Sequence, residues 1–226
     1  MIVAKRKPFQ EILTSVEEFQ KVLVVGCGTC VAVCLAGGEK EVGLLSSELA
    51  IASELKGSPL GIGEATVERQ CDREFLRELS SIVPEYDAVI SLACGVGVQF
   101  LAEMFPDAVV LPGVDTAFIG ANDDVGYWSE RCRMCNQCVL GVTGSICPVT
   151  MCAKGLLNGP CSGMRDGKCE VHPDKPCAWV QIYERLEAAG HLDRIREDLP
   201  PQKHSLSTTP SHLVHKAYRR RYPEHE

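Results

Sequence analysis

The sequence predicts an α/β protein whose second half is held together by metal instead of a large core. Over the first half of the 226 residues, apolar strand patterns alternate with amphipathic helix patterns. Eight of the 13 cysteines crowd into the stretch from Cys132 to Cys177, which has little helix or strand periodicity. From Leu199 the composition shifts to Pro, Ser, Thr, His and Arg. We therefore expect three parts: an α/β domain (1–124), a cysteine-rich region (125–190) and an extended tail (191–226).

The first elements follow from hydrophobic periodicity. Apolar residues three and four positions apart predict a helix over residues 9–19. The continuous apolar run KVLVVGC then predicts a strand that is buried on both faces. A second helix covers residues 38–57 and ends at Gly57. Its apolar face comprises Val42, Leu45, Leu49, Ala52 and Leu55.

The same alternation continues to residue 114. Asp72 is in the right position to be the N-cap of a helix. The remaining elements are strands at 65–71, 86–94 and 107–114, and helices at 72–83 and 95–105. Strands that alternate with helices are typical of an open, doubly wound, mostly parallel sheet of the Rossmann or flavodoxin type.

Five cysteines follow the strands of this sheet. Cys27, Cys71 and Cys94 fall at the carboxyl ends of three predicted strands, where doubly wound sheets bind their ligands. Cys30 and Cys34 lie just beyond the first of these strands, four residues apart on one helical face. We predict that four of the five thiols hold a metal cluster, and the sequence does not identify the fifth.

Two other interpretations of these cysteines stay open. Cys27 and Cys30 form a C-x-x-C pair beside a strand and a helix, as in a redox-active dithiol. Cys71 and Cys94 could be ordinary buried cysteines that behave as small hydrophobic residues. A dinucleotide-binding loop is disfavoured, because Val31 stands where the third glycine of G-x-G-x-x-G would fall.

The cysteine-rich region contains the run Cys132-x2-Cys135-x2-Cys138, followed by Cys147-Pro148. One loop with this spacing can bind three corners of an iron–sulfur cubane, as in bacterial ferredoxins, although the gap before the Cys-Pro is longer here. The last four cysteines could form a second tetrathiolate site or supply the fourth ligand. Zinc also accepts four thiolates, and we leave it open chiefly for these four: Cys152, Cys161, Cys169 and Cys177.

Composition and absent motifs exclude several functions. A net charge of −7 disfavours nucleic acid as a partner. The sequence contains no G-x-S-x-G, H-E-x-x-H or P-loop motif, so we predict no catalytic residues in this chain. No apolar run is long enough to cross a membrane, and the N-terminal MIVAKRKPFQEIL does not resemble a signal peptide. We expect a cytoplasmic protein.

A closing helix over residues 178–189 follows the cysteines and ends at Gly190. Its expected apolar face comprises Trp179, Ile182, Tyr183 and Leu186. We expect this helix, together with the basic residues of the tail, to hold a partner protein. Those basic residues are Lys216, Arg219, Arg220 and Arg221. A solvated chain end is the alternative explanation for the charge of the tail.

Up to about Gly190, the chain resembles the MetV family, the small iron–sulfur subunit of methylenetetrahydrofolate reductase. The resemblance lies in VVGCGTCVAVCLAGGEKEV, QCD, SLACGVGVQ and CPVTMCAKGLLNGPCSG…GKCEV…PCAWVQIYERL. It implies a protein that binds the FMN-containing TIM-barrel catalytic subunit, the flavoprotein that the closing helix and the tail would hold, and exchanges electrons with its FMN. That partner would reduce methylenetetrahydrofolate to methyltetrahydrofolate in the methyl branch of the Wood–Ljungdahl pathway.

The two cysteine sets predict at least two [4Fe-4S] clusters that pass electrons between an upstream donor and the flavoprotein. FMN would belong to the partner alone, because this chain is too short for a TIM barrel and lacks its eight-fold βα pattern. Two alternatives remain: a zinc-stabilised interaction subunit that carries no electrons, and a thiol oxidoreductase that uses Cys27 and Cys30.

Overall fold

The structure is a computed structural model, and it describes residues 1–223. The last three residues of the expected tail lie outside the described part. The chain forms two compact units, Met1–Glu130 and Arg131–Glu226.

The first unit contains a four-stranded parallel sheet in the order β3-β2-β4-β5. The middle strands β2 and β4 are apolar on both faces, and all of their residues except the first of β2 are buried. This confirms the prediction from KVLVVGC, since a strand covered on both faces needs a continuous apolar run. The strands are β2 (Lys21–Cys27), β3 (Gly61–Val67), β4 (Ala88–Ser91) and β5 (Val109–Pro112).

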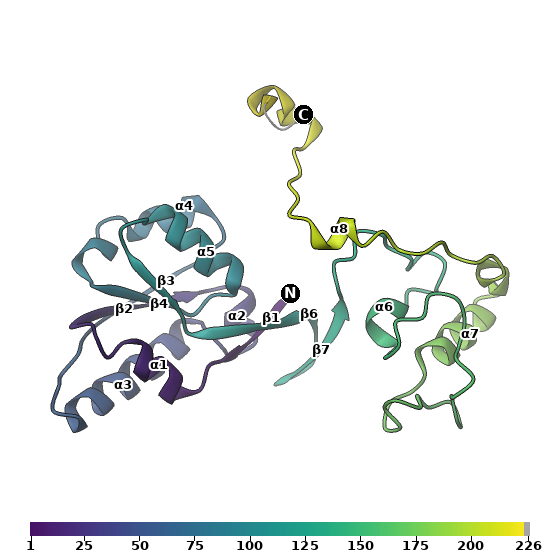
Figure 1. The fold of residues 1–226 in the computed structure, drawn as a ribbon, viewed down its shortest axis with the longest axis horizontal. Coiled ribbons are helices and arrows are strands. Elements are labelled where there is room, and N and C mark those ends of the chain that lie inside the picture. The colour runs from purple at the N-terminus through teal and green to yellow at the C-terminus, as the bar shows by residue number, and fades with distance from the viewer. Residues whose placement is uncertain (224–226) are drawn as a thin grey trace. The chain divides into compact units, whose positions relative to one another are not determined.

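Helices cover both faces of the parallel sheet (Figure 1). On one face, α1 (Phe9–Ser15) and α3 (Glu39–Leu55) pack against Val22, Val24 and Ile90. On the other face, α4 (Arg73–Leu76) and α5 (Gly95–Met104) pack against residues of opposite parity such as Leu23. Successive side chains of a strand point to opposite faces, so these few strands supply the apolar residues of two core layers.

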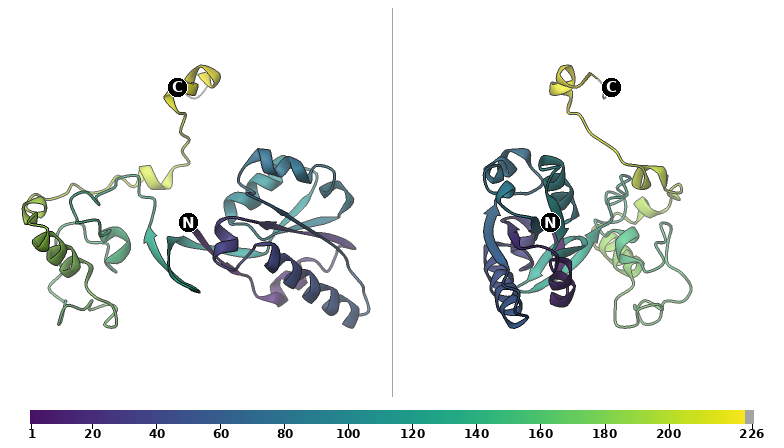
Figure 2. Two further views of the ribbon diagram at one scale, coloured as in Figure 1. Left: turned by 180° about the vertical axis from the view of Figure 1, so that it is seen from behind. Right: turned by 60° about the vertical axis from the view of Figure 1, so that its left-hand side comes forward.

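A second sheet was not predicted. It is antiparallel, with the order β1-β6-β7, and Figure 2 shows it from two further sides. Its strands are β1 (Ile2–Arg6), β6 (Val114–Asp124) and β7 (Tyr127–Cys132). The pairing of Ile2 with Ile119 joins segments that are far apart in the sequence, so no local pattern indicates it.

Several predicted boundaries were wrong. The predicted 9–19 helix ends at Ser15, although Val16 beyond it is still buried. The strand predicted at 65–71 is β3, which runs over Gly61–Val67. Cys71 therefore lies four residues beyond the end of this strand. The predicted 72–83 helix is broken into α4 and the 3-10 turns η1 (Arg77–Leu79) and η2 (Val83–Glu85).

Other details of the helices were confirmed. The Asp72 carboxylate accepts a hydrogen bond from the Glu74 amide at 3.1 Å, as expected of an N-cap. Gly57 follows the end of α3 with φ of 72°, a conformation that favours glycine. Leu55 was wrongly placed on the buried face of α3: it is 84% exposed, whereas Ser53 in the same turn is buried.

The second unit has little regular structure. The cysteine-rich part of this unit contains two helices, α6 (Pro148–Met151) and α7 (Ala178–Ala188). Trp179, Ile182 and Leu186 of α7 are buried in a small cluster with Ile146 and Cys177. Tyr183, which we expected on the same face, is 45% exposed.

Up to residue 223, the tail contains only short helical turns. These are η3 (Leu192–Ile195), α8 (Ser205–Thr208) and η4 (Lys216–Arg221). Asn158 fixes the start of the tail, because its side chain exchanges two hydrogen bonds with the backbone of Leu199. Within residues 1–223, no helix has the length and apolar character needed to cross a membrane.

Candidate metal centre

Three thiols lie at the carboxyl edge of the parallel sheet. Cys27 is the last residue of β2, Cys94 is the N-cap residue of α5 just after β4, and Cys71 follows β3. From β2, the chain continues to β3 on one side, and β4 lies on the other side. Ligands of open α/β sheets bind at such a point, where the strand order reverses. We call Cys27, Cys71 and Cys94 the rim thiols.

Electrostatics link the three rim thiols. Burial raises the pKa of the Cys71 thiol, and negative charge on Cys27 and Cys94 raises it further. The residue as a whole is exposed, but its sulfur is surrounded by enough protein for desolvation to dominate. Arg69 acts in the opposite direction. Like charges that oppose ionisation of one another are neutralised when a cation binds between them.

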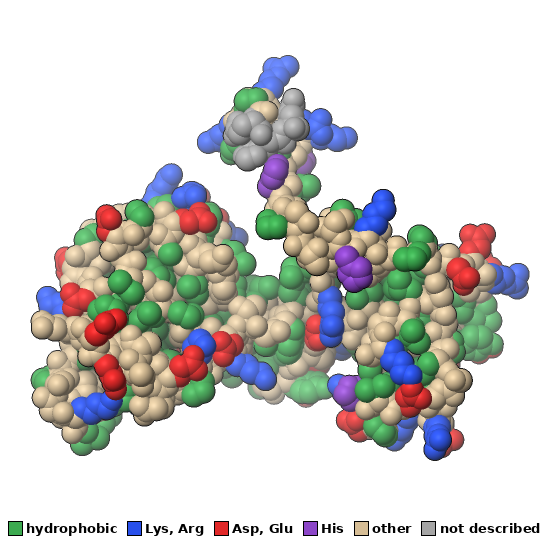
Figure 3. Space-filling model, in the orientation of Figure 1, with side chains coloured by type: hydrophobic (Ala, Val, Ile, Leu, Met, Phe, Trp, Pro, Cys, Tyr) green, Lys and Arg blue, Asp and Glu red, His purple; other side chains and the backbone are tan. Residues whose placement is uncertain are grey.

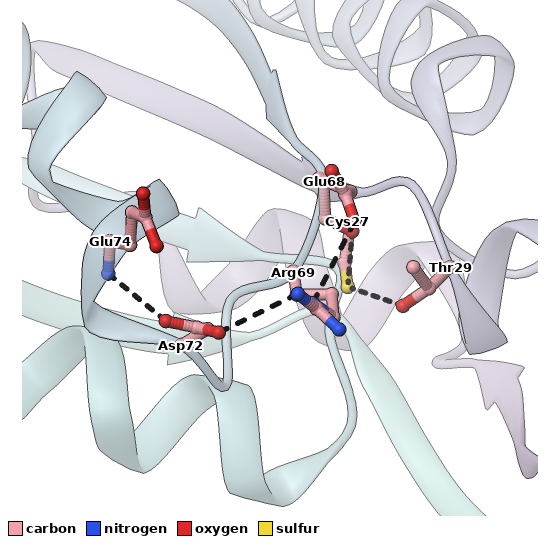
Figure 4. Close-up of polar contacts among 6 residues, drawn as sticks. All are labelled: Cys27, Thr29, Glu68, Arg69, Asp72 and Glu74. Carbon is pink, nitrogen blue, oxygen red and sulfur yellow. Dashed lines mark hydrogen bonds and ion pairs between the residues drawn. The ribbon is translucent and has the colours of Figure 1, made fainter.

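Polar groups surround the Cys27 sulfur (Figure 4). It lies 3.8 Å from the Thr29 hydroxyl and 3.9 Å from the Glu68 carbonyl oxygen. Next to it, the Arg69 guanidinium forms ion pairs with Glu68 at 3.8 Å and with Asp72 at 3.6 Å. The sequence therefore places a cation beside the rim, and the N-cap Asp72 helps to hold it.

Cys34 is separate from the rim thiols. Its buried sulfur accepts a hydrogen bond from the Ala4 amide at 3.4 Å and lies 3.5 Å from the Val31 carbonyl oxygen. Burial raises the pKa of the Cys34 thiol, and the charge that adds to this effect is that of Cys30. Cys34 thus packs between β1 and α2 (Cys30–Val33), within the apolar core.

A buried amide links backbone segments that carry the rim thiols, and sequence reasoning missed it. Gln70 is fully buried and bonds the ends of β2 and β4. A glutamine in a polar segment looks like a solvent-exposed loop residue, so no sequence signal distinguished it.

The triple-cysteine loop of the second unit has an unusual backbone. Met134 and Asn136, which lie between its cysteines, have φ of 53° and 57°. Non-glycine residues rarely adopt this conformation, and they cluster at functional sites. The Met134 amide donates a hydrogen bond to the Cys132 sulfur at 3.4 Å. Such N–H···S bonds tune iron–sulfur sites.

The other cysteines of the second unit differ in burial. Cys147 and Cys152 flank α6 at its two ends, and Cys177 is the N-cap residue of α7 and is buried. Cys152 and Cys177 both contact the small apolar cluster. At Cys161, the Gly163 amide and then the Lys154 ammonium lower the pKa of the thiol.

These residues suit a thiolate-bound metal in their chemistry, but they do not form a closed ligand cage. Among residues 1–223, no three or more His, Cys, Asp or Glu side chains are grouped so that they could hold a metal ion. What fits the metal is the donor type, the shared sheet edge and the left-handed loop between Cys132 and Cys138.

Comparison with protein families identifies the second region. Residues 111–205 match the family described as methylene-tetrahydrofolate reductase C terminal. The matched segment makes up less than half of the chain. The match confirms the resemblance seen in the sequence, and it associates the chain with methylenetetrahydrofolate reductase. All eight cysteines of the second set lie within the matched residues, whereas the rim thiols lie outside them. Neither the curated proteins nor the solved structures gave a match.

Proposed function

We propose that this chain is the iron–sulfur electron-transfer subunit of a methylenetetrahydrofolate reductase complex. The observation that carries the proposal is the match to the reductase C-terminal family, in a region with eight cysteines and a very small core. A bound iron–sulfur cluster would supply one-electron transfer. The partner would be the FMN-containing catalytic subunit, which reduces methylenetetrahydrofolate to methyltetrahydrofolate in the cytoplasm, within the Wood–Ljungdahl methyl branch.

The chain's own residues would bind two clusters. Cys132, Cys135 and Cys138 would hold one of them on the left-handed loop, with a fourth ligand from the later cysteines. The rim thiols would hold the other, with Cys30, which is only partly buried, as the candidate for the fourth ligand. Zinc at one of the sites, most plausibly among the last four cysteines, is the alternative occupant.

Anaerobic metal analysis of the full chain tests this proposal. We expect a brown protein that contains about four irons and four sulfides per cluster, and whose visible absorbance falls on reduction. Mixing the reduced protein with the flavin subunit should then bleach the FMN absorbance. A colourless protein with stoichiometric zinc would support the interaction subunit instead. Dithiol exchange activity that survives complete metal removal would support the thiol oxidoreductase.

The tail remains a candidate for docking, whereas the apolar face of α7 does not. That face is buried within its own unit, so it is not available to a partner. In contrast, the basic side chains of η4 are exposed around the end of the tail (Figure 3), together with Leu213, which is 96% exposed. An exposed apolar residue among arginines suits an acidic partner surface with an apolar centre.

Deletion of residues 205–226 tests this docking role. The deletion starts after Lys203, whose amide donates to the Gln137 side chain, so it leaves the contacts that fix the tail's first part. We expect weaker co-purification with the flavin subunit and unchanged metal content. If both the complex and the electron transfer to FMN are unchanged, the tail is not part of the interface.

A further inference from the structure

A single buried side chain connects the backbone segments that carry the three rim thiols. Gln70 is completely buried. Among the largest fully buried side chains of residues 1–223, it is the polar one. Its amide nitrogen donates to the Val25 carbonyl at 2.9 Å and to the Gly26 carbonyl at 3.1 Å. Its amide oxygen accepts a hydrogen bond from the Ser91 hydroxyl at 2.6 Å.

The network continues from Ser91 toward the third thiol. The Ser91 hydroxyl oxygen also accepts a hydrogen bond from the Ala93 amide at 3.3 Å. Both hydrogens of the Gln70 amide group are used, and its oxygen has a donor, so the buried group is satisfied. We call these residues the Gln70 network: Val25, Gly26, Gln70, Ser91 and Ala93.

Each rim thiol directly follows a member of this network. Cys27 comes after Gly26, Cys71 comes after Gln70, and Cys94 comes after Ala93. The network therefore joins the end of β2, the loop after β3 and the turn after β4, immediately before the residue whose sulfur reaches the sheet edge.

Helix α5, which begins directly after Cys94, is packed against the same side chain. A Cβ atom at Gly97 would lie 2.9 Å from the Gln70 Cβ and 2.6 Å from the Ala93 Cβ. Gly97 is buried, and only a residue without a side chain fits there. The first turn of α5 is thus fixed at contact distance from Gln70.

We propose that Gln70 is a positioning residue that sets the mutual arrangement of Cys27, Cys71 and Cys94 for binding of a thiolate-preferring metal. A buried amide with three hydrogen bonds has one orientation, so the three backbone segments cannot shift independently. Partners that orient metal ligands in this way typically change metal affinity by 10- to 100-fold when they are removed. This inference rests on the proposed role of the rim thiols as ligands.

The test uses the full chain, reduced and metal-free, with Zn²⁺ as the probe. Metal-bound thiolates resist alkylation, so iodoacetamide labelling followed by peptide mass spectrometry reads each cysteine separately. The rim thiols are in this way distinguished from Cys132–Cys177 in one sample. The quantity measured is the free Zn²⁺ concentration that half-protects each thiol.

Gln70→Met keeps the length of the side chain and removes its hydrogen bonds. We expect the free Zn²⁺ concentration that half-protects the three rim thiols to rise by about 10-fold or more. The concentration that half-protects Cys132, Cys135 and Cys138 should not change. Gln10→Met is the matched exposed control and should have no effect. Leu49→Ala, which truncates a buried side chain of α3 and leaves the hydrogen bonds of the network in place, controls for loss of stability and should leave rim protection unchanged.

A second pair of variants tests the positioning role of Gln70 if Gln70→Met does not fold. Ser91→Ala removes the hydroxyl that contacts Gln70, whereas Ser91→Thr keeps it. The alanine variant should need more Zn²⁺ than the wild type, and the threonine variant should restore protection. Equal rim protection in both variants overturns the inference.

Two further outcomes overturn the inference. One is normal Zn²⁺ protection of the rim thiols in a less stable Gln70→Met protein, which would make the network purely structural. The other is the absence of rim protection in the wild type. Failure of the proposed function looks different: Zn²⁺ binding would still depend on Gln70, but the anaerobic protein would contain no iron and would not exchange electrons with the flavin.

Discussion

Met1–Glu130 buries apolar residues on both faces of a parallel sheet, whereas Arg131–Glu226 buries one face of a single 11-residue helix. The first unit has two large apolar clusters, and the second has one small cluster that includes Cys177. Cysteine is distributed in the opposite way, with five residues before Cys132 and eight from there to Cys177. The comparison indicates that apolar burial stabilises the first unit. For the second, we propose that bonds from sulfur to metal supply the stability that its small core does not.

Metal removal should separate the two units most strongly. Under anaerobic chelation, we expect residues 132–177 to lose most of their hydrogen-exchange protection, because metal binding supplies the folding free energy of segments with little core. β2 and β4 should keep theirs. Protection of 132–177 that persists in metal-free protein would show that its small apolar cluster suffices.

Truncation of a core side chain should destabilise the first unit and leave the second unit unchanged. Leu23 is completely buried in β2, so Leu23→Ala should lower the free energy of unfolding of the first unit by about 2–5 kcal/mol. The metal content of the second unit should not change. Leu55→Ala, at a position 84% exposed, is the control and should alter stability by only about 0.5 kcal/mol. Denaturant titration followed by hydrogen exchange measures both effects.

Two cysteines of the first unit should respond differently to replacement. Cys71→Ser should remove the rim metal, since Cys71 interacts with both other rim thiols. Cys34→Ala should keep it and cost about 1 kcal/mol, because it leaves the buried Ala4 amide without its sulfur acceptor. Peptide-resolved Zn²⁺ protection and thermal unfolding distinguish the two roles. Loss of rim protection in Cys34→Ala would make Cys34 a ligand.

The sequence predicted the rim better than it predicted the whole fold. The edge shared by Cys27, Cys71 and Cys94 was predictable because parallel strands end at the same side of a sheet. The pairing of Ile2 with Ile119 was not, because antiparallel strands so distant in sequence leave no local pattern. Gln70 was missed for a similar reason: its three hydrogen bonds connect segments that only the fold brings together.

The assignment of residues to buried helix faces was the other source of error. Periodicity assigns a face to every residue of a helix, but burial depends on whether the neighbouring layer extends that far. Leu55 in the last turn of α3 and Tyr183 in α7 both continue an apolar stripe and are nevertheless exposed. The buried members of the same stripes, such as Leu49 and Ile182, were predicted correctly.

The smallest expected effect concerns pH, and it applies to the reduced, metal-free first unit. Burial raises the pKa of the Cys34 thiol, and burial followed by the charges of Cys27 and Cys94 raises that of Cys71. A thiol whose pKa is higher in the folded state contributes stability that is fully present below its unfolded pKa and is lost as pH rises through its folded pKa. The free energy of unfolding should therefore begin to decrease above roughly pH 8.5.

Cys34→Ala provides the control for this pH dependence. It removes the more deeply buried of the two thiols, so its unfolding free energy should decrease less steeply over the same alkaline range. Urea titrations of both proteins between neutral and alkaline pH give the two slopes. If the wild type instead becomes more stable as pH rises, the Cys34 and Cys71 thiols ionise more readily in the folded unit than in the unfolded chain. The folded first unit would then stabilise thiolates even without metal. In that case the two units would differ less in what stabilises them than the sizes of their apolar cores indicate.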